Sequence, residues 1–79
     1  MTVYCKIQEN KEKSAIYKFG IYLDELNGLV EFFNDSFKII NDIDSLPFGG
    51  KYPLSKLYAK YRVNFQKNQF PNDMSFESG

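Results

Sequence analysis

The sequence of 79 residues contains no histidine and no tryptophan, and its only cysteine is Cys5. Without histidine, the Ser–His and Cys–His nucleophile pairs and His-ligated metal sites are excluded. A single cysteine permits neither an intrachain disulfide nor a cysteine cluster around a structural metal, which favours a reducing compartment. Because Cys5 lies on the apolar side of a predicted strand, we expect a buried, unreactive thiol. These absences predict a protein that is not an enzyme and uses no cofactor.

Long apolar runs are also missing. No stretch approaches the roughly 18–20 apolar residues of a membrane span, and the first residues lack a basic-then-apolar secretory signal. The formal net charge is zero and the pI is about 6.2, whereas dedicated nucleic-acid binders are strongly basic. We therefore expect a cytoplasmic protein without a membrane partner, and we regard nucleic acid as an unlikely partner.

Aromatic residues are abundant, with eight Phe and six Tyr making up 18% of the chain. A chain of this length forms a single domain over residues 1–79 and buries only about 60% of its unfolded surface. Aromatic side chains bury roughly 150–250 Å² each, so a few of them can build most of a small core.

Alternating apolar and polar residues predict strands over residues 2–8 and 14–23. Two further strands, over residues 29–33 and 37–40, are apolar on both faces. The dipeptide Asn27-Gly28 predicts a tight turn before the third strand, and residues 34–36 predict another turn. A loop is expected over residues 41–51, and residues 74–77 are compatible with a last short strand.

One segment, residues 52–70, has sustained helical periodicity. Its apolar side chains fall at offsets 0, 3, 4, 7 and 11 on one helix face: Leu54, Leu57, Tyr58, Tyr61 and Phe65. Either Pro53 in the first turn or Ser55 as a cap could begin this helix, which should end near Asn68. The predicted fold is α+β, with four to five antiparallel strands in the order ββββα(β) and one C-terminal amphipathic helix on one face.

A single helix covers only one face of such a sheet, so the other face is expected to be open. We predict that Val30, Phe32 and Ile40 lie on this open face as an apolar partner surface, either for another protein or for a homodimer. Three lysines, Lys56, Lys60 and Lys67, are expected to form an exposed basic stripe on the helix, away from its apolar face.

Charge is segregated along the chain. Residues 24–44 are mainly acidic, whereas residues 45–67 contain only basic charges. Such segregation can steer a partner, although ordinary solvated faces give the same pattern. The basic stripe, interleaved with tyrosines, also supports an alternative function as a weak nucleic-acid-associated protein.

Three segments resemble small uncharacterised α+β proteins of low-GC Gram-positive bacteria: Met1-Thr2-Val3-Tyr4-Cys5-Lys6-Ile7, Lys56-Leu57-Tyr58-Ala59-Lys60-Tyr61-Arg62, and Phe70-Pro71 with Ser75-Phe76-Glu77. The high content of Lys, Asn and Ile is in keeping with an AT-rich bacterial or phage genome. The resemblance implies a class of short proteins that includes inhibitors, immunity proteins and phage accessory proteins, but it implies no site residues. We therefore expect a non-enzymatic protein-interaction module of the inhibitor or immunity type.

Overall fold

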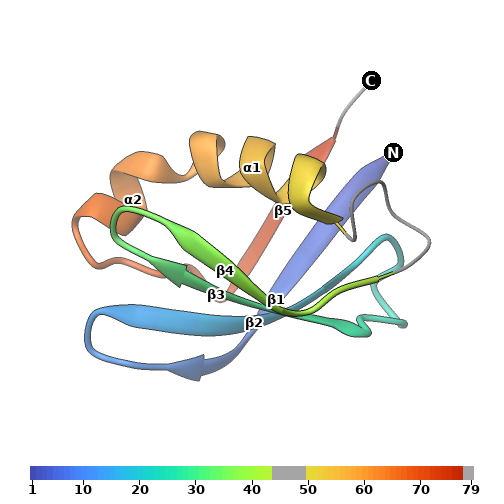
Figure 1. Cartoon of the computed structure of the whole chain (residues 1–79), viewed down its shortest axis with the longest axis horizontal. Helices are drawn as coiled ribbons and strands as arrows, with labels where there is room; N and C mark the ends of the chain where they lie inside the picture. Colours follow the sequence, from blue (N-terminus) through green and yellow to red (C-terminus); the bar gives the residue numbers. More distant parts are fainter. Residues whose placement is uncertain (44–49, 78–79) are drawn as a thin grey trace.

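The computed structural model describes residues 1–43 and 50–77, which form an α+β fold with a sheet layer and a helix layer. Five antiparallel strands are arranged in the order β4-β3-β2-β1-β5, and two helices cover one face of the sheet (Figure 1). The strands are β1 (Thr2–Asn10), β2 (Ser14–Gly20), β3 (Gly28–Phe33), β4 (Phe37–Asn41) and β5 (Asp73–Glu77), and the helices are α1 (Lys51–Lys60) and α2 (Arg62–Gln66). The predicted fold class and element order are confirmed.

The first four strands form a meander, and β5 returns after the helices to pair with β1. The β1–β2 turn is closed by a hydrogen bond from the Lys11 N–H to the Ser14 oxygen at 2.8 Å. The Phe33 N–H donates to the Ser36 oxygen at 2.8 Å and closes the β3–β4 turn. Because β5 pairs with β1 and not with β4, β4 is left as one edge of the sheet and β5 becomes the other.

The predicted tight turn at Asn27-Gly28 is wrong. The chain leaves β2 at Gly20 and needs residues 21–27 to reach β3, where Gly28 is already paired with Phe19. A Cβ atom on Gly28 would lie 2.4 Å from the Phe19 ring, so this position accommodates only glycine without a shift of the ring. The glycine is therefore required by an aromatic side chain packed over the strand rather than by a turn.

The predicted helix is divided at Tyr61, whose backbone (φ −103°, ψ 14°) departs from helical values. The predicted apolar face is confirmed, because Leu54, Leu57 and Phe65 are fully buried while Tyr58 and Tyr61 are half-buried. The helix begins at Lys51, so Ser55 is not its cap; the Ser55 hydroxyl instead donates to the Lys51 oxygen at 2.7 Å.

A Schellman motif ends α2. Asn68 adopts a positive φ of 55°, its N–H donates to the Phe65 oxygen, and the Gln69 N–H donates to the Asn64 oxygen, both at 2.9 Å. Asparagine tolerates this left-handed conformation better than most residues. The helical region thus ends close to the predicted position, and the reversal directs the chain toward β5.

The core between the layers is built around Phe32. Its ring stacks on Phe65 at 5.0 Å between centroids and contacts Tyr17, Phe37 and Tyr58. Tyr17 is also fully buried, and its hydroxyl donates to the Pro71 oxygen at 2.6 Å. Residues 44–49, which form most of the predicted loop over residues 41–51, lie outside the described part of the chain.

Candidate functional site

The predicted placement of Val30 and Phe32 on the open face is wrong. Both residues are 0% exposed and lie under the helices, with Phe32 at the centre of the aromatic cluster. Side chains of successive strand residues point to opposite faces, so a face assignment in error by one residue exchanges the two faces. Strand β3 carries apolar residues on both faces, and its alternation therefore did not reveal which face is covered.

Only Ile40 of the three predicted apolar residues is exposed, at 48%. The pairing of β3 with β4 shifts between Leu29, which faces Asn41, and Val30, which faces Ile39. This bulge leaves Ile40 without a partner on β3, and a single exposed isoleucine does not form an apolar surface.

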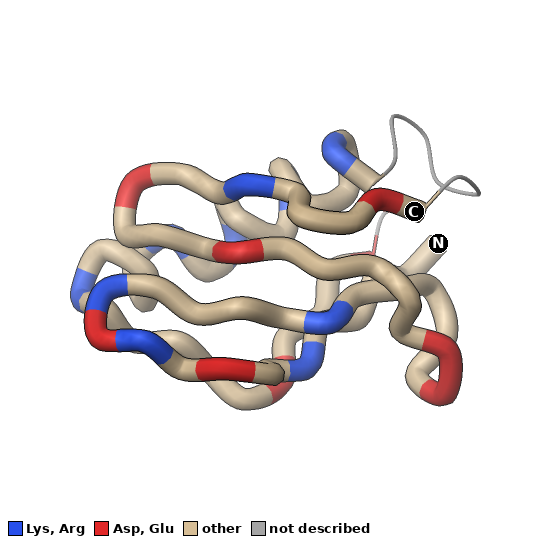
Figure 2. Tube along the Cα trace, turned by 60° about the horizontal axis from the view of Figure 1, so that its bottom comes forward, with Lys and Arg blue, Asp and Glu red and all other residues tan. Residues whose placement is uncertain are grey.

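The open face of the sheet carries charged side chains. Basic and acidic residues both occur along its strands (Figure 2). Glu31 is central to this face, where it accepts hydrogen bonds from the Ser14 hydroxyl at 2.7 Å and from the Lys11 ammonium at 3.3 Å. The Ser14 hydrogen bond, helped by Lys11, holds the pKa of Glu31 below its usual range despite the opposing effect of desolvation.

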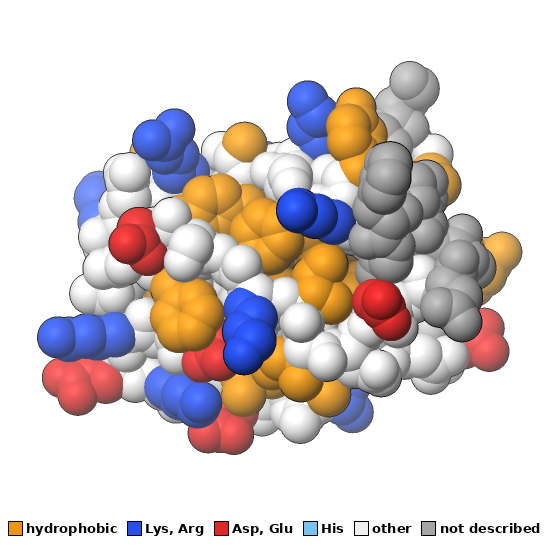
Figure 3. Space-filling model, viewed as in Figure 1, with side chains coloured by type: hydrophobic (Ala, Val, Ile, Leu, Met, Phe, Trp, Pro, Cys, Tyr) orange, Lys and Arg blue, Asp and Glu red, His pale blue; other side chains and the backbone are white. Residues whose placement is uncertain are grey.

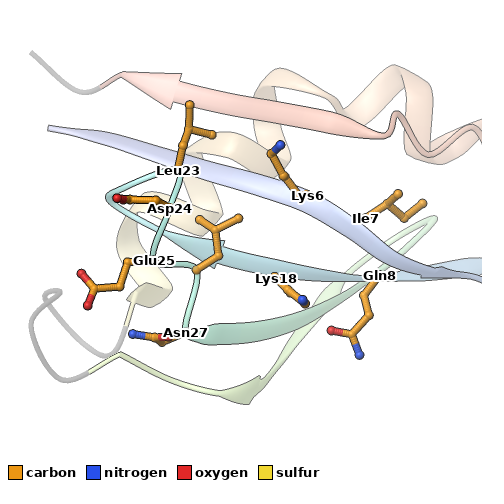
Figure 4. Close-up of a pocket in the computed structure, with 9 residues that line it drawn as sticks. Lys6, Ile7, Gln8, Lys18, Leu23, Asp24, Glu25 and Asn27 are labelled. Carbon is orange, nitrogen blue, oxygen red and sulfur yellow. The ribbon is translucent and has the colours of Figure 1, made fainter.

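A hollow of about 650 Å³ lies on the open face between strands β1 and β2 and the loop that precedes β3 (Figure 4). Lys6 and Lys18 are directly paired across β1 and β2 at its base, an arrangement of like charges that is unfavourable by itself. Asp24 and Glu25 line the loop side, and their carboxylates point away from the two ammonium groups. The hollow is a mixed-charge depression without a convergent set of polar groups.

The helix layer bonds to the middle of the β5 edge of the sheet, at Ser75. The Lys60 ammonium donates to the Ser75 oxygen at 2.9 Å, and the Ser75 N–H donates to the Tyr61 hydroxyl at 3.4 Å. Both backbone groups that β5 presents outward at Ser75 are therefore satisfied from within the chain. Lys60 is solvent-exposed as predicted, but its ammonium group stabilises this edge.

The other two lysines of the predicted stripe are exposed. The Lys56 ammonium lies 5.5 Å from the centre of the Tyr52 ring, and Lys67 is the C-terminal cap residue of α2. Since Lys60 contacts β5, the stripe does not present three equivalent free cations.

Strand β4 is the outermost strand on its side of the sheet in the described part of the chain, and a groove of about 520 Å³ separates it from α1. Hydrophobic side chains gather at the centre of the molecular face that carries this edge (Figure 3). The groove is lined by Phe37 and Ile39 of β4 and by Tyr58 of α1. Ser55 and Lys51 line it nearer to the N-terminus of the helix. We call this site the β4–α1 groove.

A second hollow, of about 420 Å³, extends the β4–α1 groove along the helix layer to Ala59, Arg62 and Gln66. Tyr58 and Asp35 line both hollows. The Tyr58 hydroxyl donates to the Asn34 oxygen at 3.4 Å, which links the helix to the β3–β4 turn at this point.

The β4–α1 groove was not predicted from the sequence, because the predicted partner surface was on a face of the sheet rather than at an edge. A signal was nevertheless present: a meander followed by a helix leaves its last strand at an edge, and residues 37–40 are apolar on both sides.

Cys5 is buried, and desolvation raises the pKa of its thiol to about 12. The nucleophilic thiolate is therefore scarce at neutral pH. Within residues 1–43 and 50–77, no group of three or more Cys, Asp or Glu residues is placed to hold a metal ion. Neither helix in this part of the chain has the length and apolar character that a membrane crossing requires.

Comparison with protein-family models, curated proteins and solved structures finds no match to this chain. The β4–α1 groove, with its apolar floor beside an open strand edge, is the best-defined candidate site of the described residues.

Proposed function

We propose that this protein is a non-enzymatic protein-interaction module of the inhibitor or immunity type, and that it binds its partner through the β4–α1 groove. The observation that carries the proposal is an apolar groove adjoining an unpaired strand edge. Edge strands of soluble domains are normally protected, because an open edge invites pairing with another chain. Here the helix layer bonds to β5 at Ser75, whereas within residues 1–43 and 50–77 no strand pairs with the outer side of β4.

The chemistry of the groove supports binding rather than catalysis. Its floor consists of the side chains of Phe37, Ile39 and Tyr58, and its polar lining is provided by Ser55, Lys51 and Asp35. The tyrosine belongs to a residue type enriched at the energetic centres of protein interfaces. The titratable groups of the groove lining are Asp35, Lys51 and Tyr58, and the Tyr58 hydroxyl donates to the Asn34 oxygen.

The alternative function, weak association with nucleic acid through the basic helix face, has less support. Lys60 is engaged with the Ser75 oxygen, and Lys56 lies over the Tyr52 ring. Nucleic-acid binding would also weaken steeply with added salt, whereas binding in an apolar groove would not.

A photo-crosslinking amino acid at position 55 tests the proposal in cells that naturally produce the protein. Ser55 lines the groove, and Val63, which is 63% exposed on α2 and outside the groove lining, provides a matched control position. We expect a discrete adduct with one protein from position 55 and none from position 63. Equal labelling from both positions, no protein adduct, or a salt-sensitive nucleic-acid adduct would contradict the proposal.

A further inference from the structure

Two residues of β4, Phe37 and Ile39, direct backbone hydrogen-bonding groups away from the sheet. The Phe33 N–H donates to the Ser36 oxygen, so this pair begins the ladder with a hydrogen bond. Hydrogen-bonded and non-hydrogen-bonded pairs alternate along an antiparallel ladder. Lys38 therefore turns its N–H and C=O toward β3, while the groups of Phe37 and Ile39 point outward.

The same two residues place their side chains in the β4–α1 groove. An additional strand on β4 would thus bond to the backbone of Phe37 and Ile39 and fill the groove with every second side chain. The bulge of β4 lies beyond Ile39, so this part of the edge keeps regular pairing geometry.

The two walls of the groove are short. Between Phe37 and Ile39, strand β4 extends for roughly 7 Å. Helix α1 advances roughly 10 Å from Lys51 to Tyr58 at 1.5 Å per residue. An extended segment of about three residues spans these walls.

The groove and the second hollow that extends it each carry one basic residue in their lining, Lys51 in the groove and Arg62 in the second hollow. Neither forms an ion pair in the part of the chain that the structure describes, where the ion pairs are Lys6–Asp73 and Lys11–Glu31. Asp35 lies near Arg62 in the lining of the second hollow and reduces the positive charge there. Within the lining of the first hollow, Lys51 belongs to the end opposite the β3–β4 turn that contains Asp35.

We propose that the β4–α1 groove binds an extended segment of a partner protein as an additional strand on β4. The segment carries apolar side chains at alternate positions and an Asp or Glu beside Lys51. This inference rests on the proposed function and specifies the form of the partner. In this recognition mode, backbone hydrogen bonds provide affinity and the alternating pockets provide specificity.

A second copy of this chain fits the groove less well. Strand β4 itself has Lys38 and no carboxylate, so the β4 strand of a second copy would place no acidic residue of its own beside Lys51. An acidic segment of another protein instead complements the charge of Lys51.

The test is selection of nine-residue random peptides, displayed on phage, against the immobilised full chain. We expect selected sequences to have apolar residues at positions i and i+2 and an acidic residue on one flank. Methylation of single backbone amides in a synthetic selected peptide should weaken binding roughly tenfold at every second position and little at the positions between. This period of two is the signature of an added strand.

Variants with matched controls locate the peptide. Ser55→Arg fills the groove and should abolish binding, whereas Val63→Arg should leave binding unchanged. Lys51→Glu should change the preferred flanking residue from acidic to basic, and Lys56→Glu, five residues along the same helix, should not. An unchanged preference in the Lys51→Glu variant would overturn the assigned contact with the acidic residue.

Other outcomes separate this inference from the proposed function. Selected peptides with apolar residues at helical spacing and no period of two would overturn strand addition. They would leave the proposed function as a protein-interaction module standing. An adduct at position 55 without any selected peptide would do the same. A dimer of the free protein that is lost in the Ser55→Arg variant would identify a second copy as the occupant and overturn the inference. Failure of both the selection and the cross-linking would overturn both proposals.

Discussion

The two edges of the sheet differ in how the chain treats their exposed backbone. At β5, the side chains of Lys60 and Tyr61 bond to both outward groups of Ser75, so the helix layer covers the middle of this edge. At β4, a groove separates the helix layer from the edge, and the Tyr58 hydroxyl reaches across to the β3–β4 turn. Because a small domain must manage two edges with one short helix layer, covering one leaves the other available for binding.

The largest expected effect concerns the aromatic core around Phe32, on which both edges of the sheet depend. Phe32→Ala should reduce the free energy of unfolding by about 3–5 kcal/mol, because it leaves a cavity among Tyr17, Phe37, Tyr58 and Phe65. The neighbouring Phe33→Ala should cost much less, since Phe33 lies on the opposite face and is half-buried. Urea unfolding measures both, and equal losses would mean that the faces of β3 are misassigned.

Amide hydrogen exchange tests the contrast within β4. The Lys38 N–H, which is turned toward β3, should exchange at least roughly a hundredfold more slowly than the outward N–H groups of Phe37 and Ile39. Two-dimensional NMR of the protein in D₂O resolves these amides individually. Slow exchange at Phe37 and Ile39 would show that the β4 edge is covered in the free protein.

Much of the fold was predictable from the sequence, for identifiable reasons. The strands with one wet face were located by alternation, and the helix was located by the spacing of Leu54, Leu57 and Phe65. These signals are local and depend on one side of an element being dry. The α2 end was also predictable, because the helical pattern stops near Asn68.

The misplaced features depend on contacts between distant residues. Gly28 was interpreted as a turn residue, but its role is set by the ring of Phe19 on the neighbouring strand. Val30 and Phe32 were assigned to the wrong face because β3 has apolar residues on both. The β4–α1 groove was missed since it depends on which strand the helix layer leaves uncovered, and no single segment contains that information.

The closure of the β5 edge can be weakened with a conservative change. Lys60→Gln should lower the free energy of unfolding by about 1 kcal/mol, because the amide side chain is too short to retain the bond to the Ser75 oxygen. Lys67→Gln is the matched control and should change stability by less than about 0.5 kcal/mol, because Lys67 is exposed and forms no ion pair with a described residue. If both variants lose the same amount in urea melts, Lys60 does not stabilise the edge.

The smallest effect concerns pH and the attachment of β4. Glu31 on β3 faces Lys38 on β4. The pKa of Glu31 is lowered mainly by the Ser14 hydrogen bond and to a smaller extent by Lys11 and Lys38. A carboxyl group whose pKa is lower in the folded state stabilises the fold above its unfolded pKa, about 4.3 for Glu. That contribution is lost as the pH falls through the folded pKa.

The urea midpoint of the wild type should therefore fall more between about pH 5 and pH 3 than that of Glu31→Gln. Since Lys38 interacts with this carboxylate, amides of β4 should lose protection in acid before those of β5. Identical acid dependence in the two proteins, or earlier loss at β5, would show that Glu31 does not hold the open edge in place.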